Sequence, residues 1–407
     1  MGQSTDYLVV GAGIVGLAVA RELRKRYPKL RITILEKEAA VGHHASGRNS
    51  GVLHSGIYYG GGTVKARVCT QGARRMKAFA AEHGIHCHHT GKIIIATSPE
   101  DLATLERLQE NARHNGVRIE VLDEQGIRQI EPFAGVFQQG IYCLDTAVID
   151  AKAVLYKLVA LLRDDDVSIV FNAQVIAVDI PARTVKTPQG EWHYGYLFNC
   201  AGAFADQVAR YFERGLDYAL LPFKGIYFKL HPQRNPMVRA NIYPVPNMGQ
   251  PFLGVHVTRS IHGEVYAGPT AIPALGRENY GMLQGAKWGE SWRTGYALSR
   301  MYRANRHNFR KLVHSELGKY RKKDFLASVN KLLPDLTGED LVPCDKVGIR
   351  PQLVNIRENR LEMEFILEQS PDSLHVLNAI SPAFTSALAL AEWIVDQAHH
   401  HALRPVT

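Results

Sequence analysis

Three glycines near the start of the chain, Gly11, Gly13 and Gly16, have the spacing of a phosphate-binding turn. An apolar run precedes them, a helical pattern follows, and a second apolar run ends on Glu36, roughly 20 residues after the last glycine. Gly11 would permit the tight turn, Gly13 a close approach to a pyrophosphate, and Gly16 close packing of helix on strand. The pattern predicts a βαβ dinucleotide-binding unit, although position alone does not separate FAD from NAD.

The residues around this turn suit the charges of a dinucleotide. The helix that starts at Ile14 and Val15 offers free N–H groups and a partial positive charge to the phosphates. The Glu36 carboxylate can accept hydrogen bonds from ribose hydroxyls, and its charge would repel a 2′-phosphate.

Length and composition narrow the class of protein. The 407 residues can form two domains, and 46% hydrophobic with 21% charged residues is typical of globular proteins. The five cysteines are scattered and form no CxxC pair, which favours a reducing compartment over a disulfide framework or a zinc ribbon. The glycine motif begins too early for a signal peptide to precede it, and no apolar stretch could span a bilayer. We therefore expect a cytoplasmic protein.

Periodicity predicts a discontinuous nucleotide-binding domain. We expect a helix over 64–83 with Thr63 as its N-cap, a strand over 91–97 and a helix over 99–115. Later apolar runs return the chain to the nucleotide sheet and are expected as strands over 168–171, 175–178, 196–203 and 374–379, with a last helix over 382–397. The expected nucleotide-binding domain comprises residues 1–90, 150–215 and 345–407, and the substrate domain comprises residues 91–149 and 216–344.

Basic residues are concentrated in one segment of a chain whose net charge is +9. Between Arg300 and Lys331, ten lysines and arginines alternate with apolar residues. One interpretation is a basic amphipathic helix on anionic lipid at the inner face of the cytoplasmic membrane. A second is a solvated helix face. No recognised motif supports a third, nucleic-acid binding, so we expect no nucleic-acid partner.

Several dispersed motifs resemble the FAD-dependent D-amino-acid oxidase/glycine oxidase superfamily, and within it most closely the L-2-hydroxyglutarate dehydrogenase/oxidase family. They are NSGVLHSGIYY at 49–59, NIYPVP at 241–246, PFLGVH at 251–256, GIR at 348–350 and NAISPA at 378–383. The chain departs from the family at 44–50, where HASGRNS replaces the usual HQTGHNS, and near Gly276, where a lysine is absent. Pro351 after Arg350 is closer to glycine oxidase.

The resemblance implies FAD as the cofactor and an α/β fold. It implies a Rossmann-type, glutathione-reductase-like FAD-binding domain beside an α+β substrate domain built on an antiparallel or mixed sheet. We expect Ser381 to cap the last helix, whose N-terminus would face the flavin. The expected FAD-binding residues are Gly11, Gly13, Ile14, Val15, Gly16, Glu36, Lys37, Ser46, Arg48, Asn49, Ser50, Val175, Cys200, Ala201, Gly202, Ser381, Pro382 and Ala383.

Four residues are the catalytic candidates. The resemblance implies that Arg350 clamps the substrate carboxylate, for which a planar guanidinium is suited. It places His54 beside the flavin, where a neutral imidazole can act as the base, although His54 could instead be a flavin ligand. His256 is a second base candidate, and Tyr243, like Tyr58 and Tyr59, could place a hydroxyl in the pocket. Arg277 could pair with a second carboxylate or lie on the surface.

The expected reaction is oxidation of an L-2-hydroxy acid, with L-2-hydroxyglutarate as the leading substrate. Electrons would pass from the flavin to O2 or to a membrane quinone. The alternative is oxidation of an amine by the same flavin geometry, and a more distant one is a non-enzymatic flavoprotein or RNA-modification partner. Neither the 86–89 nor the 399–401 histidine cluster has a standard metal-ligand spacing, so we expect no functional metal.

Overall fold

The computed structural model describes residues 2–248 and 252–398 of the chain. It divides into two compact units, the first formed by residues 1–48, 151–221 and 351–407 and the second by 49–150 and 222–350. Residues 49–90, which we grouped with the nucleotide-binding segments, contribute to the second unit. The reason is local: β3 (Val52–Leu53) and β4 (Cys87–His88) both pair with β8 (Ala147–Ile149).

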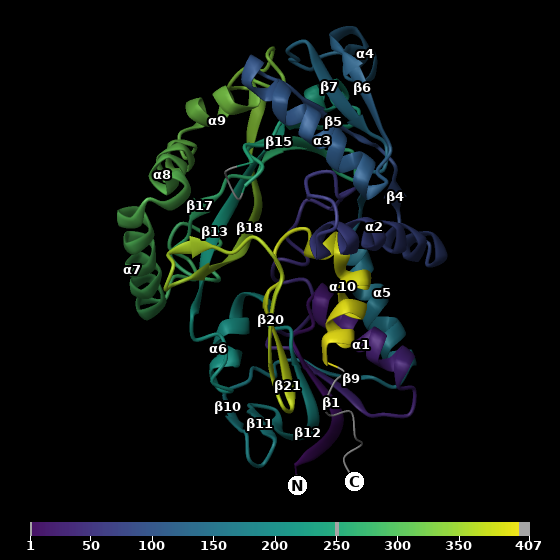
Figure 1. Cartoon of the computed structure of the whole chain (residues 1–407), viewed down its shortest axis with the longest axis vertical. Helices are drawn as coiled ribbons and strands as arrows, with labels where there is room; N and C mark the ends of the chain where they lie inside the picture. Colours follow the sequence, from purple (N-terminus) through teal and green to yellow (C-terminus); the bar gives the residue numbers. More distant parts are fainter. Residues whose placement is uncertain (1, 249–251, 399–407) are drawn as a thin grey trace. The chain divides into compact units, whose positions relative to one another are not determined.

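The first unit is built on a mostly parallel sheet. Strand β1 (Gln3–Val10) pairs in parallel with β2 (Ile32–Leu35) and with β12 (Gly190–Asn199), and β2 pairs with β9 (Ser168–Val170). Six successive residues of β1 are buried, as expected for a parallel strand covered on both faces. Helix α1 (Ile14–Arg26) packs against α10 (Ala383–Gln397) and α5 (Ala151–Asp164) (Figure 1).

Shorter elements complete this unit. They are β10 (Ala177–Asp179), β11 (Thr184–Thr187), η2 (Gly202–Phe204), α6 (Ala205–Arg210), β19 (Arg360–Leu361), β20 (Ile366–Ser370) and β21 (Ser373–Asn378). β21 pairs in parallel with β12, which confirms that the late apolar run rejoins the nucleotide sheet. The strand predicted over 175–178 begins two residues later than expected, so Val175 precedes β10 instead of lying on it.

The second unit is built on a mixed sheet in which β18-β13-β16-β15-β14-β5-β7-β6 are successive neighbours, and the far end of β18 also pairs with β19. Its strands are β5 (Lys92–Ile95), β6 (Ile119–Asp123), β7 (Gln139–Cys143), β13 (Tyr218–Leu230), β14 (Asn241–Pro244), β15 (His256–Arg259), β16 (Val265–Gly268), β17 (Ile272–Pro273) and β18 (Leu341–Asn355). β14 and β5 run parallel, whereas β5–β7, β14–β15 and β15–β16 are antiparallel. The mixed sheet predicted for the substrate domain is therefore confirmed.

The helices of the second unit follow local sequence signals. They are α2 (Val64–Glu82), η1 (Pro99–Asp101), α3 (Leu102–Asn115), α4 (Glu124–Ile130), η3 (Pro232–Met237), α7 (Trp288–Ala304), η4 (Arg306–Asn308), α8 (Phe309–Gly318) and α9 (Lys322–Val329). Thr63 caps α2 as predicted, because its hydroxyl accepts a hydrogen bond from Ala66 N at 3.1 Å. The basic segment is not one helix: Asn305 and Asn308, both with positive φ, separate α7 from α8.

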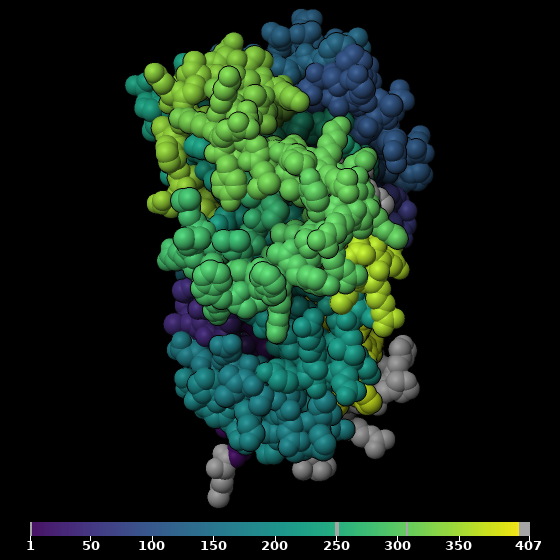
Figure 2. Space-filling view, turned by 90° about the vertical axis from the view of Figure 1, so that its left-hand side faces the viewer, coloured from purple at the N-terminus to yellow at the C-terminus, as the bar shows by residue number. Residues whose placement is uncertain are grey.

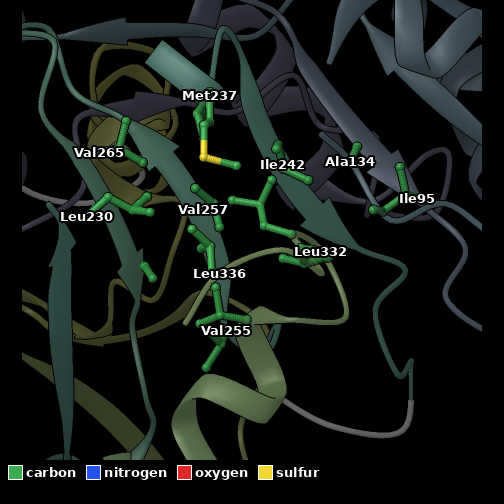
Figure 3. Packing of buried hydrophobic residues seen from close by; sticks show 14 of the residues in the cluster. Ile95, Ala134, Leu230, Met237, Ile242, Val255, Val257, Val265, Leu332 and Leu336 are labelled. Atoms are coloured by element: carbon green, nitrogen blue, oxygen red, sulfur yellow. The ribbon is translucent and has the colours of Figure 1, made fainter. Parts of the chain in front are cut away.

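The two faces of the mixed sheet differ in chemistry. Ile95, Ile242 and Val257 face a hydrophobic core (Figure 3). The same core contains Ile93 of β5 and Phe325 of α9. Side chains alternate along a strand, so Lys92, Ile94, Tyr243 and His256 project from the opposite face. Ile94 and Tyr243 of this face belong to a second hydrophobic core with Leu105 and Leu108 of α3, so both faces are packed and the polar groups are set within the second core.

Candidate active site

The glycine turn of the first unit has the close contacts that the motif predicts. Gly11 has a φ of +101°, and a Cβ built on it would lie 2.6 Å from the carbonyl oxygen of Cys200. A Cβ on Gly16 would lie 1.9 Å from the Gly11 carbonyl oxygen. The turn between β1 and α1 therefore packs against the end of β12 with room for hydrogen atoms only.

Two polar side chains converge on this turn. The Glu36 carboxylate accepts hydrogen bonds from Ala12 N at 2.7 Å and from Glu38 N at 3.0 Å, and Ser46 Oγ accepts one from Ile14 N at 2.9 Å. The helix N-terminus, the acidic group after β2 and the serine hydroxyl are thus adjacent. This donor and acceptor set fits a dinucleotide, with N–H groups for phosphate and a carboxylate for ribose.

Other predicted cofactor residues have local partners. Lys37 forms an ion pair with Glu38, and its Nζ lies 4.9 Å from the centroid of the Phe204 ring. Burial alone would raise the pKa of Glu38, but hydrogen bonds from Lys37 and His44 lower it to about 2. The Glu38 carboxylate is therefore ionised at neutral pH. Arg48 has a separate partner: its Nε donates a hydrogen bond to the His43 carbonyl at 2.7 Å.

The second flavin contact inferred from the resemblance lies at the end of β12. Cys200 is buried, and burial raises the pKa of its thiol to about 12, so the thiol stays protonated. Ala201 N donates to Asn199 Oδ1 at 3.2 Å, and a Cβ on Gly202 would meet nothing within 4 Å. The structure thus brings Cys200 to the glycine turn and leaves space beside Gly202.

The expected cap of the last helix is wrong. Helix α10 begins at Ala383, and Pro382, not Ser381, occupies the N-cap position without a side-chain hydrogen bond. Asn49 and Ser50 belong to the second unit, where their side chains accept hydrogen bonds from Gly51 N and Val52 N. Ser381 and Pro382 lie directly before α10, and only this position keeps them candidates for flavin contact.

A second cluster lies on the polar face of the mixed sheet. The rings of Tyr243 and His256 stack with centroids 4.0 Å apart and an angle of 17°. Lys92 is fully buried, and its Nζ donates to Tyr58 Oη at 3.2 Å while lying 4.2 Å and 5.0 Å from the Tyr58 and Tyr243 ring centroids. Across residues 2–248 and 252–398, no carboxylate forms an ion pair with Lys92. Its charge is balanced by dipoles and π faces only.

Burial, with a smaller contribution from the charge of Lys92, sets the pKa values of the two histidines. Burial, and then the charges of Lys92 and His256, lower the pKa of His54 to about 3. Burial also lowers the pKa of His256 to about 4, with Lys92 adding to the shift and a hydrogen bond to the Gly254 carbonyl opposing it. Both imidazoles are therefore neutral at physiological pH.

Arg350 is a second cation without an acidic partner in the described part of the chain. Its guanidinium carbon lies 4.9 Å from the centroid of the Phe252 ring, and its buried Nε has no hydrogen-bond partner. Burial lowers the pKa of Arg350 to about 10, with the interaction with Tyr59 opposing the shift. The guanidinium stays charged at neutral pH, and one of its donors is unused.

Lys92 was not predicted from the sequence, and of the two alternatives for Arg277 the surface position is wrong. The only available signal for Lys92 was a charged residue within an otherwise apolar strand, Lys92–Ile95. Arg277 is neither a surface residue nor a free cation: it is buried, and its Nε lies 3.1 Å from a Glu290 carboxylate oxygen. The histidine run at 399–401 lies outside the described residues.

A family profile described as "FAD dependent oxidoreductase", DAO, matches residues 6–397. The chain belongs to this family of FAD-dependent oxidoreductases, which settles FAD over NAD as its cofactor. The L-2-hydroxyglutarate dehydrogenase of Escherichia coli K12 is 33% identical to it over 396 residues, covering 96% of this chain and 92% of the relative. The human mitochondrial L-2-hydroxyglutarate dehydrogenase is 31% identical, covering 97% of this chain and 88% of the relative. The family predicted from the sequence is confirmed.

Solved structures show the same fold at low sequence identity. An L-α-glycerophosphate oxidase from Mycoplasma pneumoniae, solved with FAD bound, has a TM-score of 0.77 at 20% identity, covering 100% of this chain and 97% of that one. A glycine oxidase from Geobacillus kaustophilus has a TM-score of 0.70 at 18% identity, covering 97% and 95%. Both support the fold class predicted from the sequence.

The first prediction concerns the close approach of Gly16 to the Gly11 carbonyl oxygen. We expect Gly16→Ala to weaken FAD binding by roughly tenfold or more, because overpacking of this kind costs about 1–3 kcal/mol. Flavin absorbance per protein after gel filtration measures the effect. Gly338→Ala is the matched control, because its Cβ would meet nothing within 4 Å. Equal FAD content in the two variants would contradict the assigned role of the turn.

Proposed function

We propose that this chain oxidises L-2-hydroxyglutarate, a 2-hydroxy acid with a second carboxylate, to 2-oxoglutarate. The observation that carries the proposal is a pair of cations, the fully buried Lys92 and the half-buried Arg350 with its buried Nε, which have no carboxylate partner within the described residues. Burying an unpaired charge is costly, so such a site favours an anionic ligand. The names of the relatives support the particular dicarboxylate.

The charges and hydrogen-bond donors suit the two ends of such a substrate. The Arg350 fork can bind the carboxylate next to the reacting carbon in a bidentate manner. Tyr58 accepts the Lys92 hydrogen bond and can donate its own proton to the distal carboxylate. Burial raises the pKa of Tyr58, so this hydroxyl remains protonated. Lys92 thus acts behind Tyr58 as a positioning residue.

Hydroxyl oxidation also needs a proton acceptor. FAD, when bound, supplies the hydride acceptor, N5. His54 is the proposed base for the substrate hydroxyl, and its ring is neutral as that role requires. A base with a pKa of about 3 is weak, but the negative charge of a bound dicarboxylate would offset Lys92 and raise the pKa of His54. Substrate binding would therefore make His54 a stronger base, although burial, the larger cause of its low pKa, would remain. His256 and Tyr243 would line the same face.

Electrons would leave the reduced flavin for O2 or a membrane quinone. The second acceptor requires a peripheral contact with an anionic membrane, for which the basic segment between Arg300 and Lys331 is suited. Across residues 2–248 and 252–398, no helix is long and apolar enough to cross a bilayer.

Amine oxidation is the second candidate, and Pro351 after Arg350 is the observation that favours it. The charge of the cluster opposes it, because Lys92 and Arg350 would repel the ammonium group of an amino acid.

A substrate panel distinguishes the two reactions. We expect anaerobic L-2-hydroxyglutarate to bleach the flavin fastest, L-2-hydroxybutyrate to react at least tenfold more slowly at limiting concentration, and glycine or D-alanine not to react. Stopped-flow absorbance at the flavin maximum gives the rates. Faster bleaching by an amino acid would overturn the assigned reaction, and equal rates for the two hydroxy acids would remove the distal carboxylate from recognition.

The carboxylate clamp is tested by Arg350→Lys. Lysine keeps the charge and loses the fork, and loss of one partner of a buried charge pair costs about 2–5 kcal/mol. We therefore expect KM to rise about thirtyfold or more while FAD content is unchanged. The control is Arg277→Lys, whose native arginine is already paired with Glu290. A larger rise in KM for the control would move the clamp to Arg277.

The role of Lys92 is tested through pH. Burial lowers the pKa of Lys92 to about 8, with Cys143 and Cys69 opposing the shift, so its charge is present below pH 8 and lost above it. In the wild type, we expect KM for the dicarboxylate to rise as the pH is raised above 8. In Lys92→Met, we expect KM to be high already and not to change with pH in that range. Removing the charge also raises the pKa of His54, so the acid limb of the kcat/KM profile should move to higher pH.

Lys346→Met is the matched control for Lys92→Met. Lys346 also lies over two tyrosine rings, Tyr227 and Tyr266, but its charge is not among the causes of the His54 or His256 shifts. It should retain the wild-type pH profile. An unaltered profile in Lys92→Met would show that Lys92 is only a packing residue.

A further inference from the structure

An exposed group of apolar side chains lies at the start of α7 and in the loop before it. This aromatic patch consists of Met282, Leu283, Trp288, Trp292 and Tyr296, whose exposed fractions are 91%, 74%, 94%, 80% and 61%. Figure 2 shows the face that α7 to α9 (green) present to solvent. Large side chains this exposed and this close in sequence usually mark an interaction site.

The geometry of α7 makes the patch continuous. Trp288, Trp292 and Tyr296 follow at intervals of four residues, so they form one stripe along the helix. The buried residues Thr294 and Met301 lie on the other side of the helix, about 180° away at 100° per residue. The stripe therefore faces outward, and its tryptophans contribute little to the packing of α7.

The charges around the patch have one sign. Residues 282–323 contain eleven lysines and arginines and only two acidic residues, Glu290 and Glu316. Both acids are turned inward and paired: Glu290 with Arg277, and Glu316 with Lys319 and with Ala271 N. One acidic residue of α9, Asp324, does reach the surface, where it pairs with Arg321, so the outer surface of α7 to α9 presents a large excess of cations over carboxylates.

We propose that the aromatic patch inserts at the headgroup level of an anionic lipid bilayer, with the basic side chains of α7 to α9 on the lipid phosphates. Tryptophan and tyrosine favour the boundary between acyl chains and water, and basic side chains on the same helix add attraction to anionic lipid. A second copy of this chain fits less well, because a symmetric contact would bring like charges together. The inference specifies the membrane contact of the proposed function and does not depend on the substrate.

The test uses the FAD-loaded protein and vesicles of phosphatidylcholine with or without phosphatidylglycerol. We expect co-sedimentation with the anionic vesicles, a blue shift of tryptophan emission and quenching by brominated acyl chains. In Trp288→Ser/Trp292→Ser the partition coefficient should fall about tenfold or more, and the blue shift should disappear, because the two other tryptophans, Trp192 and Trp393, are not in the patch. Bound FAD shows that the variant is folded.

The matched control is Tyr156→Ser/Leu216→Ser, which removes two exposed apolar side chains elsewhere, with exposed fractions of 56% and 59%. It should bind vesicles as the wild type does. Equal binding of all three proteins, or equal partition between neutral and anionic vesicles at low salt, would overturn the proposal. If the wild type is a dimer in the absence of lipid and Trp288→Ser/Trp292→Ser is a monomer, the patch would instead bind a second copy of the chain. Turnover is not measured in these experiments, so their failure would leave the proposed reaction untouched.

Discussion

The removal of two positive charges from solvent without carboxylate partners, Lys92 completely and Arg350 in part, is the constraint on which the proposed chemistry depends. A buried ammonium or guanidinium is tolerated only when other groups replace its hydration. Lys92 obtains a hydroxyl and two ring faces, and Arg350 obtains one ring face while its Nε remains unused. An anionic substrate would supply the interactions that these two cations lack.

The mixed sheet explains how the second unit can hold such a cluster. Ile93, Ile95, Ile242 and Val257 fix β5, β14 and β15 against the hydrophobic core. The same strands then present Lys92, Tyr243 and His256 on their other face, at a spacing set by strand register. The second face also packs in a hydrophobic core, which includes Ile94, Tyr243 and Leu108. Burial among these apolar side chains moves the pKa values of the titrating groups far from their ordinary ones.

Features formed by residues close together in the sequence could be predicted from it, and features formed by distant residues could not. The glycine turn and Glu36 were predictable because turn, helix and strand are consecutive, and the structure joins them as expected. Lys92 could not be found this way, since its site requires Tyr58 and Tyr243, which are distant in sequence. The Ser381 cap failed because a preference for serine at an N-cap cannot fix the residue at which α10 begins. The aromatic patch was missed because a tryptophan in a helix is usually buried, and only the structure shows which side of α7 is covered.

The central claim, recognition of a dianion by Lys92 and Arg350, is tested most directly by equilibrium binding of unreactive ligands. Glutarate and butyrate differ in the second carboxylate, and perturbation of the flavin spectrum gives the Kd of each for the oxidised enzyme at pH 7. We expect glutarate to bind about tenfold more tightly or better, because its second carboxylate neutralises a second cation. Equal affinities, or tighter binding of butyrate, would contradict it.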